Sequence, residues 1–119
     1  MIDSRNFVDN VHKAVYRTTI DGIINLLRTP PGRNPRPDLV SLSAWFNGLD
    51  DHSAEQVKEV IRLSVDQSVF GILAVLDGVR AVDDDGAGLT LLSDGTPLNA
   101  DGDLHDQFRN LVDQELGFS

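Results

Sequence analysis

The side chains of this sequence best suited to acid–base chemistry are one aspartate and two histidines. Asp77 follows the apolar run of residues 69–76, where a carboxylate would be desolvated. Desolvated carboxylates are common in functional sites. Imidazole is the side chain that most readily exchanges a proton near neutral pH, and His12 and His105 could supply it. Asp77, His12 and His105 are therefore the candidate catalytic residues.

Asp66 and Asp77, together with the histidines, also have a structural interpretation, in which they hold the fold together rather than catalyse a reaction. Arg62 precedes Asp66 by four residues and Arg80 follows Asp77 by three, which is the spacing of ion pairs on a helix. Asp66 and Asp77 would lie about 16 Å apart along a helix, whereas carboxylates that act on one bond lie about 5 to 9.5 Å apart. We therefore expect local ion pairs for these aspartates, and surface or capping roles for the histidines.

A short acidic segment near the C-terminus has the composition of a cation site. Asp101, Asp103 and His105 offer oxygen and nitrogen ligands within five residues. The spacing does not fit a calcium-binding loop, because Pro97 and Phe108 would occupy the first and twelfth ligand positions. The acidic run 83–85 fails the same test. We expect no metal site, and helix capping is the ordinary role of aspartates in this position.

Arginines surround a proline-rich connector at residues 29–37, which contains four of the five prolines. Arg28, Arg33 and Arg36 could bind a small anion, because guanidinium groups match phosphate and carboxylate geometry. Alternatively, they hold the connector against the acidic surface of the same chain. We favour the second interpretation.

Several classes of chemistry are excluded or disfavoured. The chain has no cysteine, which excludes disulfides, thiolate zinc sites and a cysteine nucleophile. It has no serine-hydrolase elbow, no dinucleotide-binding glycine motif and no phosphate-binding loop. We therefore expect no cofactor, and an enzyme is the less favoured interpretation.

The periodicity of apolar residues predicts a single mainly α domain over residues 1–119, a four-helix bundle-like fold with a central third helix. Asp3 or Ser4 would cap the first helix, and Asp38 would cap the second, in which Trp45 would be buried. A Ser53–Gln56 capping box would begin the third helix. The predicted elements are helices at 3–29, 38–48, 53–80 and 103–117, with the connector at 29–37 and a β-hairpin at 89–98 that turns at Asp94 and Gly95.

The predicted third helix is the most distinctive part of the chain. It would be about 42 Å long, against about 35 Å for a compact domain of this size. It must therefore kink near Gly71, or project and pack on a second copy. Residues 69–76 are apolar on every side, which predicts complete burial, either in a dimer interface or against the other helices of the same chain. The predicted interface residues are Phe70, Gly71 and Ala74, next to a face of small residues at Ser64, Ser68, Gly71 and Gly78.

The charge of the chain constrains its partners. The net charge is −9, although residues 1–37 carry six basic against three acidic side chains. Such an acidic chain repels phosphate backbones, so we expect no nucleic-acid partner. With neither a secretory signal nor a membrane-spanning run in the sequence, we expect a cytoplasmic protein that does not bind membranes.

We predict a small acidic protein that is not an enzyme and acts by protein–protein binding. It would form a homodimer and could also bind a basic protein. The alternative is an enzyme, or a binder of small anions or metals, that uses Asp77 with the histidines or the connector arginines.

Overall fold

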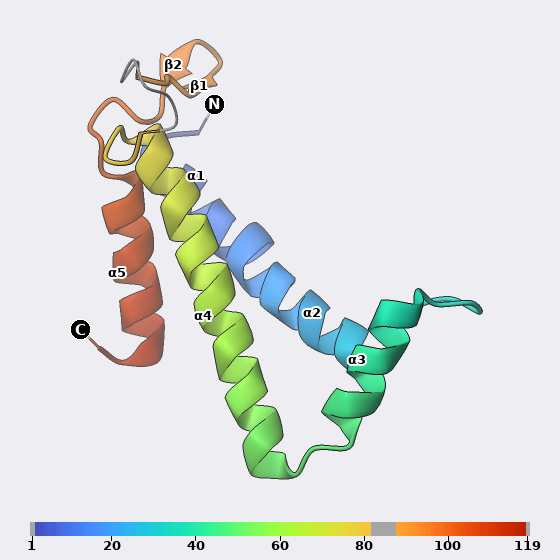
Figure 1. Cartoon of the computed structure of the whole chain (residues 1–119). Helices are drawn as coiled ribbons and strands as arrows, with labels where there is room; N and C mark the ends of the chain where they lie inside the picture. The colour runs from blue at the N-terminus through green and yellow to red at the C-terminus, as the bar shows by residue number, and fades with distance from the viewer. Residues whose placement is uncertain (1, 82–87, 119) are drawn as a thin grey trace.

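The computed structural model describes residues 2–81 and 88–118, so the acidic run 83–85 lies outside the described residues. The chain is mainly helical, with a small antiparallel hairpin before the last helix, as the sequence predicts. The elements are α1 (Ser4–Val11), η1 (His12–Arg17), α2 (Thr18–Arg28), α3 (Pro37–Asn47), α4 (Asp51–Leu76), β1 (Leu92–Ser93), β2 (Thr96–Pro97) and α5 (Leu104–Leu116). Figure 1 shows the first helix in three sections, a shorter helix α3 after it, the long central helix α4, and the C-terminal helix α5.

The first helix begins and ends where the sequence predicts. The Asp3 side chain accepts a hydrogen bond from the backbone N–H of Asn6 at 2.8 Å and so caps the helix. Its middle section, η1, is a π-helical turn that the sequence did not predict. Val8, His12 and Tyr16 are all buried at intervals of four residues. Because an α-helix repeats every 3.6 residues, such a series drifts around the helix, and the wider π turn keeps it directed at the core.

Helix α3 begins one residue earlier than predicted, and its buried face is narrower. It begins at Pro37, a residue favoured in the first helical turn, so Asp38 is not its N-cap. Phe46 is buried, but Trp45 is 54% exposed, so the prediction of a buried tryptophan is wrong. The reason is that α3 packs mainly on α2, which covers only one side of it.

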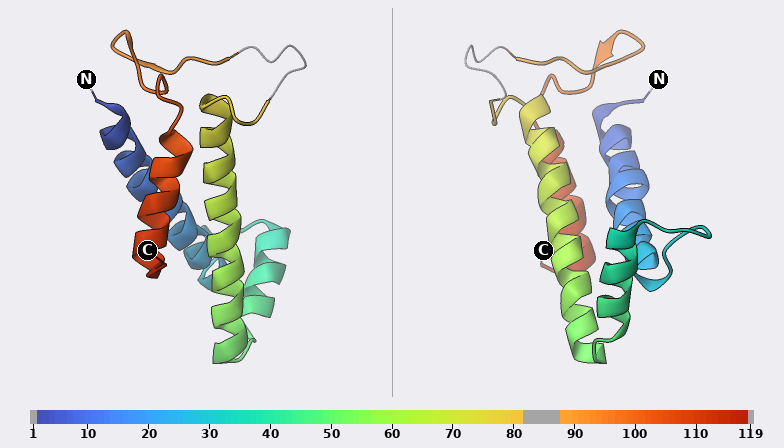
Figure 2. Two further views of the ribbon diagram at one scale, coloured as in Figure 1. Left: turned by 90° about the vertical axis from the view of Figure 1, so that its left-hand side faces the viewer. Right: turned by 45° about the vertical axis from the view of Figure 1, so that its right-hand side comes forward.

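Helix α4 is a single continuous helix of 26 residues, and its two ends differ from the prediction. The N-cap is Asp50, whose carboxylate accepts from the backbone N–H of Ser53 at 2.7 Å, so the predicted Ser53 cap is wrong. The helix ends at Leu76, short of Arg80. Since it is not interrupted at Gly71, it resolves the length problem by projecting beyond α5, as Figures 1 and 2 show.

The hairpin and α5 agree with the prediction, although the strands are short. Strand β1 pairs with β2 in the register Leu92 to Pro97, and the turn has positive φ at Asp94 and Gly95. Helix α5 ends at Gly117, which adopts the left-handed conformation.

The core lies where α5 packs against α4 and the first helix. We call this part the packed half, meaning α1, η1, α5 and residues 65–76 of α4. The open half consists of α2, α3 and residues 51–64 of α4. The first helix crosses α4 at an angle, so the molecule is elongated, with extents of 48 × 35 × 31 Å (Figure 1). The residues of the core cluster are Val8, Tyr16, Val65, Val69, Leu73, Leu104, Phe108 and Val112.

Residues 69–76 are not completely enclosed, contrary to the prediction. Leu73 and Ala74 are 2% exposed, but Ile72 is 56% exposed. The chain therefore covers the face of α4 that meets α5 and the first helix, and leaves a neighbouring face open to solvent.

Candidate functional site

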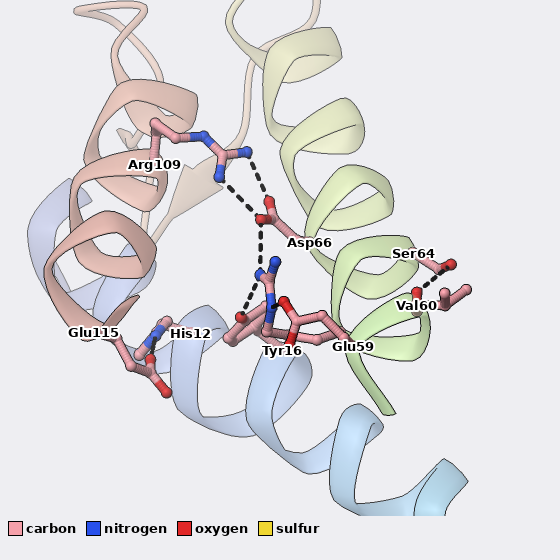
Figure 3. A network of polar contacts seen from close by, with 9 residues as sticks. His12, Tyr16, Glu59, Val60, Ser64, Asp66, Arg109 and Glu115 are labelled. Carbon is pink, nitrogen blue, oxygen red and sulfur yellow. Dashed lines mark hydrogen bonds and ion pairs between the residues drawn. The ribbon is translucent and has the colours of Figure 1, made fainter. Parts of the chain in front are cut away.

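A buried carboxylate, Asp66, joins three helices of the packed half. It is 3% exposed and receives two hydrogen bonds from Arg109 of α5, at 2.7 and 3.0 Å (Figure 3). Arg62 donates a third at 3.3 Å and also reaches the Tyr16 hydroxyl at 3.4 Å. This pairing offsets the cost of burying the carboxylate. We call Asp66, Arg62, Arg109 and Tyr16 the Asp66 network.

The Asp66 network keeps its cations charged. Hydrogen bonding to Asp66 raises the pKa of Arg109. Hydrogen bonding to Tyr16, aided by Glu59, raises the pKa of Arg62. Neither guanidinium can therefore donate a proton near neutral pH. The local Arg62–Asp66 pair is confirmed, whereas Arg109 was missed because it lies 43 residues away in the sequence.

His12, a candidate catalytic residue, is buried and bound to a carboxylate. Its Nε2 lies 2.6 Å from Glu115 of α5, and its ring stacks on Tyr16 with centroids 5.3 Å apart. A hollow of about 270 Å³ next to this pair is lined by two cationic and two acidic side chains. Its charges balance, so the hollow does not select ligands of one sign. Its lining residues are Tyr16, Arg17, Ile20, Asp21, Arg62 and Glu115.

The other two catalytic candidates, Asp77 and His105, lie in contact. Asp77 Oδ2 accepts a hydrogen bond from the backbone N–H of His105 at 2.8 Å and also contacts His105 Nδ1. The Asp77 side chain is fully buried, and its Oδ1 has no hydrogen-bond partner among the described residues. The expected Asp77–Arg80 pair is therefore wrong, since Arg80 lies over Gly71.

The Asp77–His105 pair ties the end of α4 to the start of α5. Because the His105 N–H belongs to the first turn of α5, Asp77 supplies the cap that this helix lacks from its own N-cap residue, Asp103. His105 Nε2 faces the Asp106 carboxylate at 3.4 Å. The pair thus has the orientation of a carboxylate-held imidazole, but its second nitrogen is directed at another acid rather than at a nucleophile.

The candidate metal ligands are not brought together. Within residues 2–81 and 88–118, no three histidine or acidic side chains converge as a cation site requires. Asp103 accepts a hydrogen bond from Gln107 at 3.0 Å, His105 is held by Asp77, and Asp101 is exposed.

The connector arginines are also separate. Arg36 forms an ion pair with Asp38 at 2.7 Å, and Arg33 is exposed. Arg28 lines a hollow with Lys58 and two acids, Asp51 and Glu55. Arg36 is thus paired with a neighbour two residues along the chain, which does not show the arginines holding the connector against the acidic surface.

An apolar groove runs between the first helix and α4, on the side of α4 away from α5. Its volume is about 360 Å³. Ser64 donates its hydroxyl to the Val60 carbonyl at 2.8 Å, and Ser68 to the Ser64 carbonyl at 2.8 Å (Figure 3 shows the first). Both hydroxyl donors are thus satisfied within the helix. The groove residues are Val15, Thr19, Ile23, Ser64, Val65, Ser68 and Val69.

The groove lies close to the predicted interface but not on the same residues. Ala74 is buried within the chain, Gly71 lies beneath Arg80, and Phe70 packs between His105 and Arg109. The chain itself covers these three positions. Of the predicted small-residue face, Ser64, Ser68 and Gly78 are exposed, and Gly71 is buried.

Comparison of the chain with family models, curated proteins and solved structures finds no match. None of the described helices is long and apolar enough to cross a membrane.

Proposed function

We propose that this chain acts by binding proteins, in the first instance a second copy of itself, and not by catalysis. The observation that supports this is an excess of accessible surface. The chain exposes 7798 Å², whereas a folded monomer of 13.0 kDa exposes about 6,300 Å². Its radius of gyration is 17.5 Å, against about 13 to 14 Å for a compact domain of 119 residues.

Much of the exposed surface on the helices is apolar. Several large side chains with over a third of their surface exposed lie in the open half and beside the groove, where water contact is unfavourable and a partner would remove it. These side chains are Val15, Leu26, Val40, Leu42, Trp45, Val60, Leu63 and Ile72.

The charge supports one class of further partner. With a net charge of −9, the assembly would attract a basic protein and repel nucleic acid. A chain without cysteine also suits the reducing cytoplasm, which is where we propose that it works.

Size-exclusion chromatography with light scattering tests the proposal directly. We expect a species of twice the 13.0 kDa chain mass at micromolar concentrations, which dissociates on dilution. A species of single chain mass at every concentration, together with no capture of basic proteins, would contradict the proposal.

One observation favours a second candidate function, the binding of a small ligand. Asp77 and His105 are in contact, and Asp77 Oδ1 lacks a partner among the described residues. Thermal melting against divalent cations and phosphorylated metabolites tests this, since a ligand at 100 times its Kd adds about 2.7 kcal/mol. A shift that is lost in His105→Ala, but kept in Arg36→Ala, would support it.

A further inference from the structure

The exposed face of α4 carries a row of four residues that is symmetrical in size. Val60, Ser64, Ser68 and Ile72 follow one another at intervals of four, so they form one ridge on the helix surface. Val60 is 63% exposed and Ile72 is 56% exposed. The two serines between them are small. The order large, small, small, large reads the same in both directions about a point midway between Ser64 and Ser68.

We propose that this ridge is a twofold interface, in which α4 packs antiparallel to α4 of a second copy. The axis passes between Ser64 and Ser68. In that register Ser64 faces Ser68 of the partner subunit, and Val60 faces Ile72 of the partner subunit. A twofold interface requires one surface to be complementary to itself, which is the property that the symmetrical row provides. This inference rests on the proposed function, because it assumes that two copies associate and names the surface through which they do so.

The hydrogen bonds of the ridge allow close approach. Helices pack about 8 to 10 Å apart, and the shorter distances require small side chains at the crossing. Ser64 and Ser68 meet this need, and their hydroxyl donors are already bonded to the carbonyls of Val60 and Ser64. Burying the serines therefore leaves no hydroxyl donor without a partner, so no such desolvation cost opposes the contact.

The groove supplies the rest of the contact. Val15 and Ile23 line its other wall, so the second copy would contact the first helix as well as α4. Each chain would thus contribute two long helices to a four-helix arrangement. The whole chain exposes 7798 Å², about 1,500 Å² more than a compact monomer, and a standard stable interface of roughly 800 Å² per partner would remove about half of that excess.

Charge does not oppose the contact at short range. The groove is lined by Val15, Thr19, Ile23, Ser64, Val65, Ser68 and Val69, and the ridge adds Val60 and Ile72, so neither carries a charged side chain. Two chains of net charge −9 still repel each other as wholes, and salt screens this repulsion. Association through this face should therefore strengthen as the salt concentration rises.

The chain contains no cysteine, so introduced cysteines can report the register. We expect Val60→Cys mixed with Ile72→Cys to give covalent dimers with a short bis-maleimide crosslinker. Each variant alone should give few, because identical positions would lie about 18 Å apart along the helices. Equal crosslinking of each variant alone would overturn the register.

A charge placed at the centre of the ridge tests the surface itself. Ser64→Arg should weaken dimerisation by about 30-fold or more, measured by sedimentation, because it buries an unpaired cation. Gln114→Arg, an exposed position on α5, is the matched control and should dimerise as the unmodified chain does. Circular dichroism checks that each variant is folded.

The outcomes separate the two proposals. A dimeric chain that neither crosslinks as expected nor responds to Ser64→Arg would overturn the ridge interface and leave association intact. A monomeric chain would overturn the ridge interface and the self-association in the proposed function, and failure to capture basic proteins as well would overturn the proposed function as a whole.

Discussion

The packed half and the open half share the first helix and α4 but differ in what covers them. In the packed half, Leu104, Phe108 and Val112 of α5 are 0% exposed. In the open half, the described side chains that are buried are Leu27, Ser43 and Phe46, and residues 51–64 of α4 contribute none. The presence of α5 explains this difference, since it contacts α4, η1 and α1 and does not extend along the open half.

The two halves also differ in whether their charged side chains lie buried or at the surface. The Asp66 carboxylate in the packed half and the Asp77 carboxylate, which directly follows that half at the end of α4, are both buried and both held by α5, through Arg109 and His105. The open half holds its charges at the surface, as in the exposed pair of Lys58 with Glu55. We infer that the packed half determines folding stability and that the exposed faces determine association. Substitutions should separate the two properties.

The largest expected effect is in the packed half. Phe108→Ala should lower the free energy of unfolding by about 3 to 5 kcal/mol, because it leaves a cavity among Tyr16, His12 and α4. Leu63→Ala, at a position that is 50% exposed, should change it by about 0.5 kcal/mol or less. Urea unfolding followed by circular dichroism measures both. Similar losses for the two variants would contradict the division into halves.

The Asp66 network should give the next largest effect. Asp66→Ala leaves Arg109 and Arg62 facing each other without their carboxylate. Removing one partner of a fully buried pair costs about 3 to 5 kcal/mol, and partial solvent access of both guanidiniums reduces this to about 2 to 3 kcal/mol. Glu55→Ala, which breaks the exposed pair with Lys58, should cost about 0.5 kcal/mol or less in the same urea experiment. Equal effects would show that the network adds nothing beyond a surface pair.

The sequence predicts the helices well because their signals are local. Apolar spacing, the Asp3 cap and the glycine after α5 each act within a few residues, and each is found where expected. The prediction for Trp45 fails for a different reason. Its spacing on α3 fits a buried face, but a side chain on that face is buried only where another helix packs over it. The same reason explains Ile72, whose apolar surroundings in sequence do not fix which face of α4 is covered.

The polar sites show more clearly which contacts the sequence cannot predict. Asp77 and His105 were both candidates, but nothing in the sequence indicates that residues 28 apart meet. Asp50 was missed as a cap because Ser53 and Gln56 offer a competing pattern three residues later. The small-residue face at Ser64 and Ser68 was found because its spacing lies on one helix. Contacts within an element are therefore predictable here, and contacts between elements are not.

The remote cap on α5 predicts a smaller loss of stability. Asp77→Ala should lower the free energy of unfolding by about 1 to 2 kcal/mol, since it removes the acceptor for the His105 N–H. Asp103→Ala should cost less, because Asp103 occupies the N-cap position without making the cap hydrogen bond. Thermal melting of the two variants compares them. A greater loss in Asp103→Ala would show that Asp77 is not the effective cap.

The smallest effect belongs to the open half and depends on pH. The backbone N–H of Ser53 lowers the pKa of Asp50 below its usual 3.8, so the ionised carboxylate stabilises the folded chain. This contribution is present above pH 3.8 and is lost as the pH falls through the lower folded-state pKa. Asp50→Asn should therefore melt like the unmodified chain near neutral pH, because asparagine caps equally well, but should lose less stability on acidification below that value. Ser53→Ala keeps the backbone donor and should lie between the two, whereas parallel melting curves for all three would show that the charge of Asp50 contributes nothing.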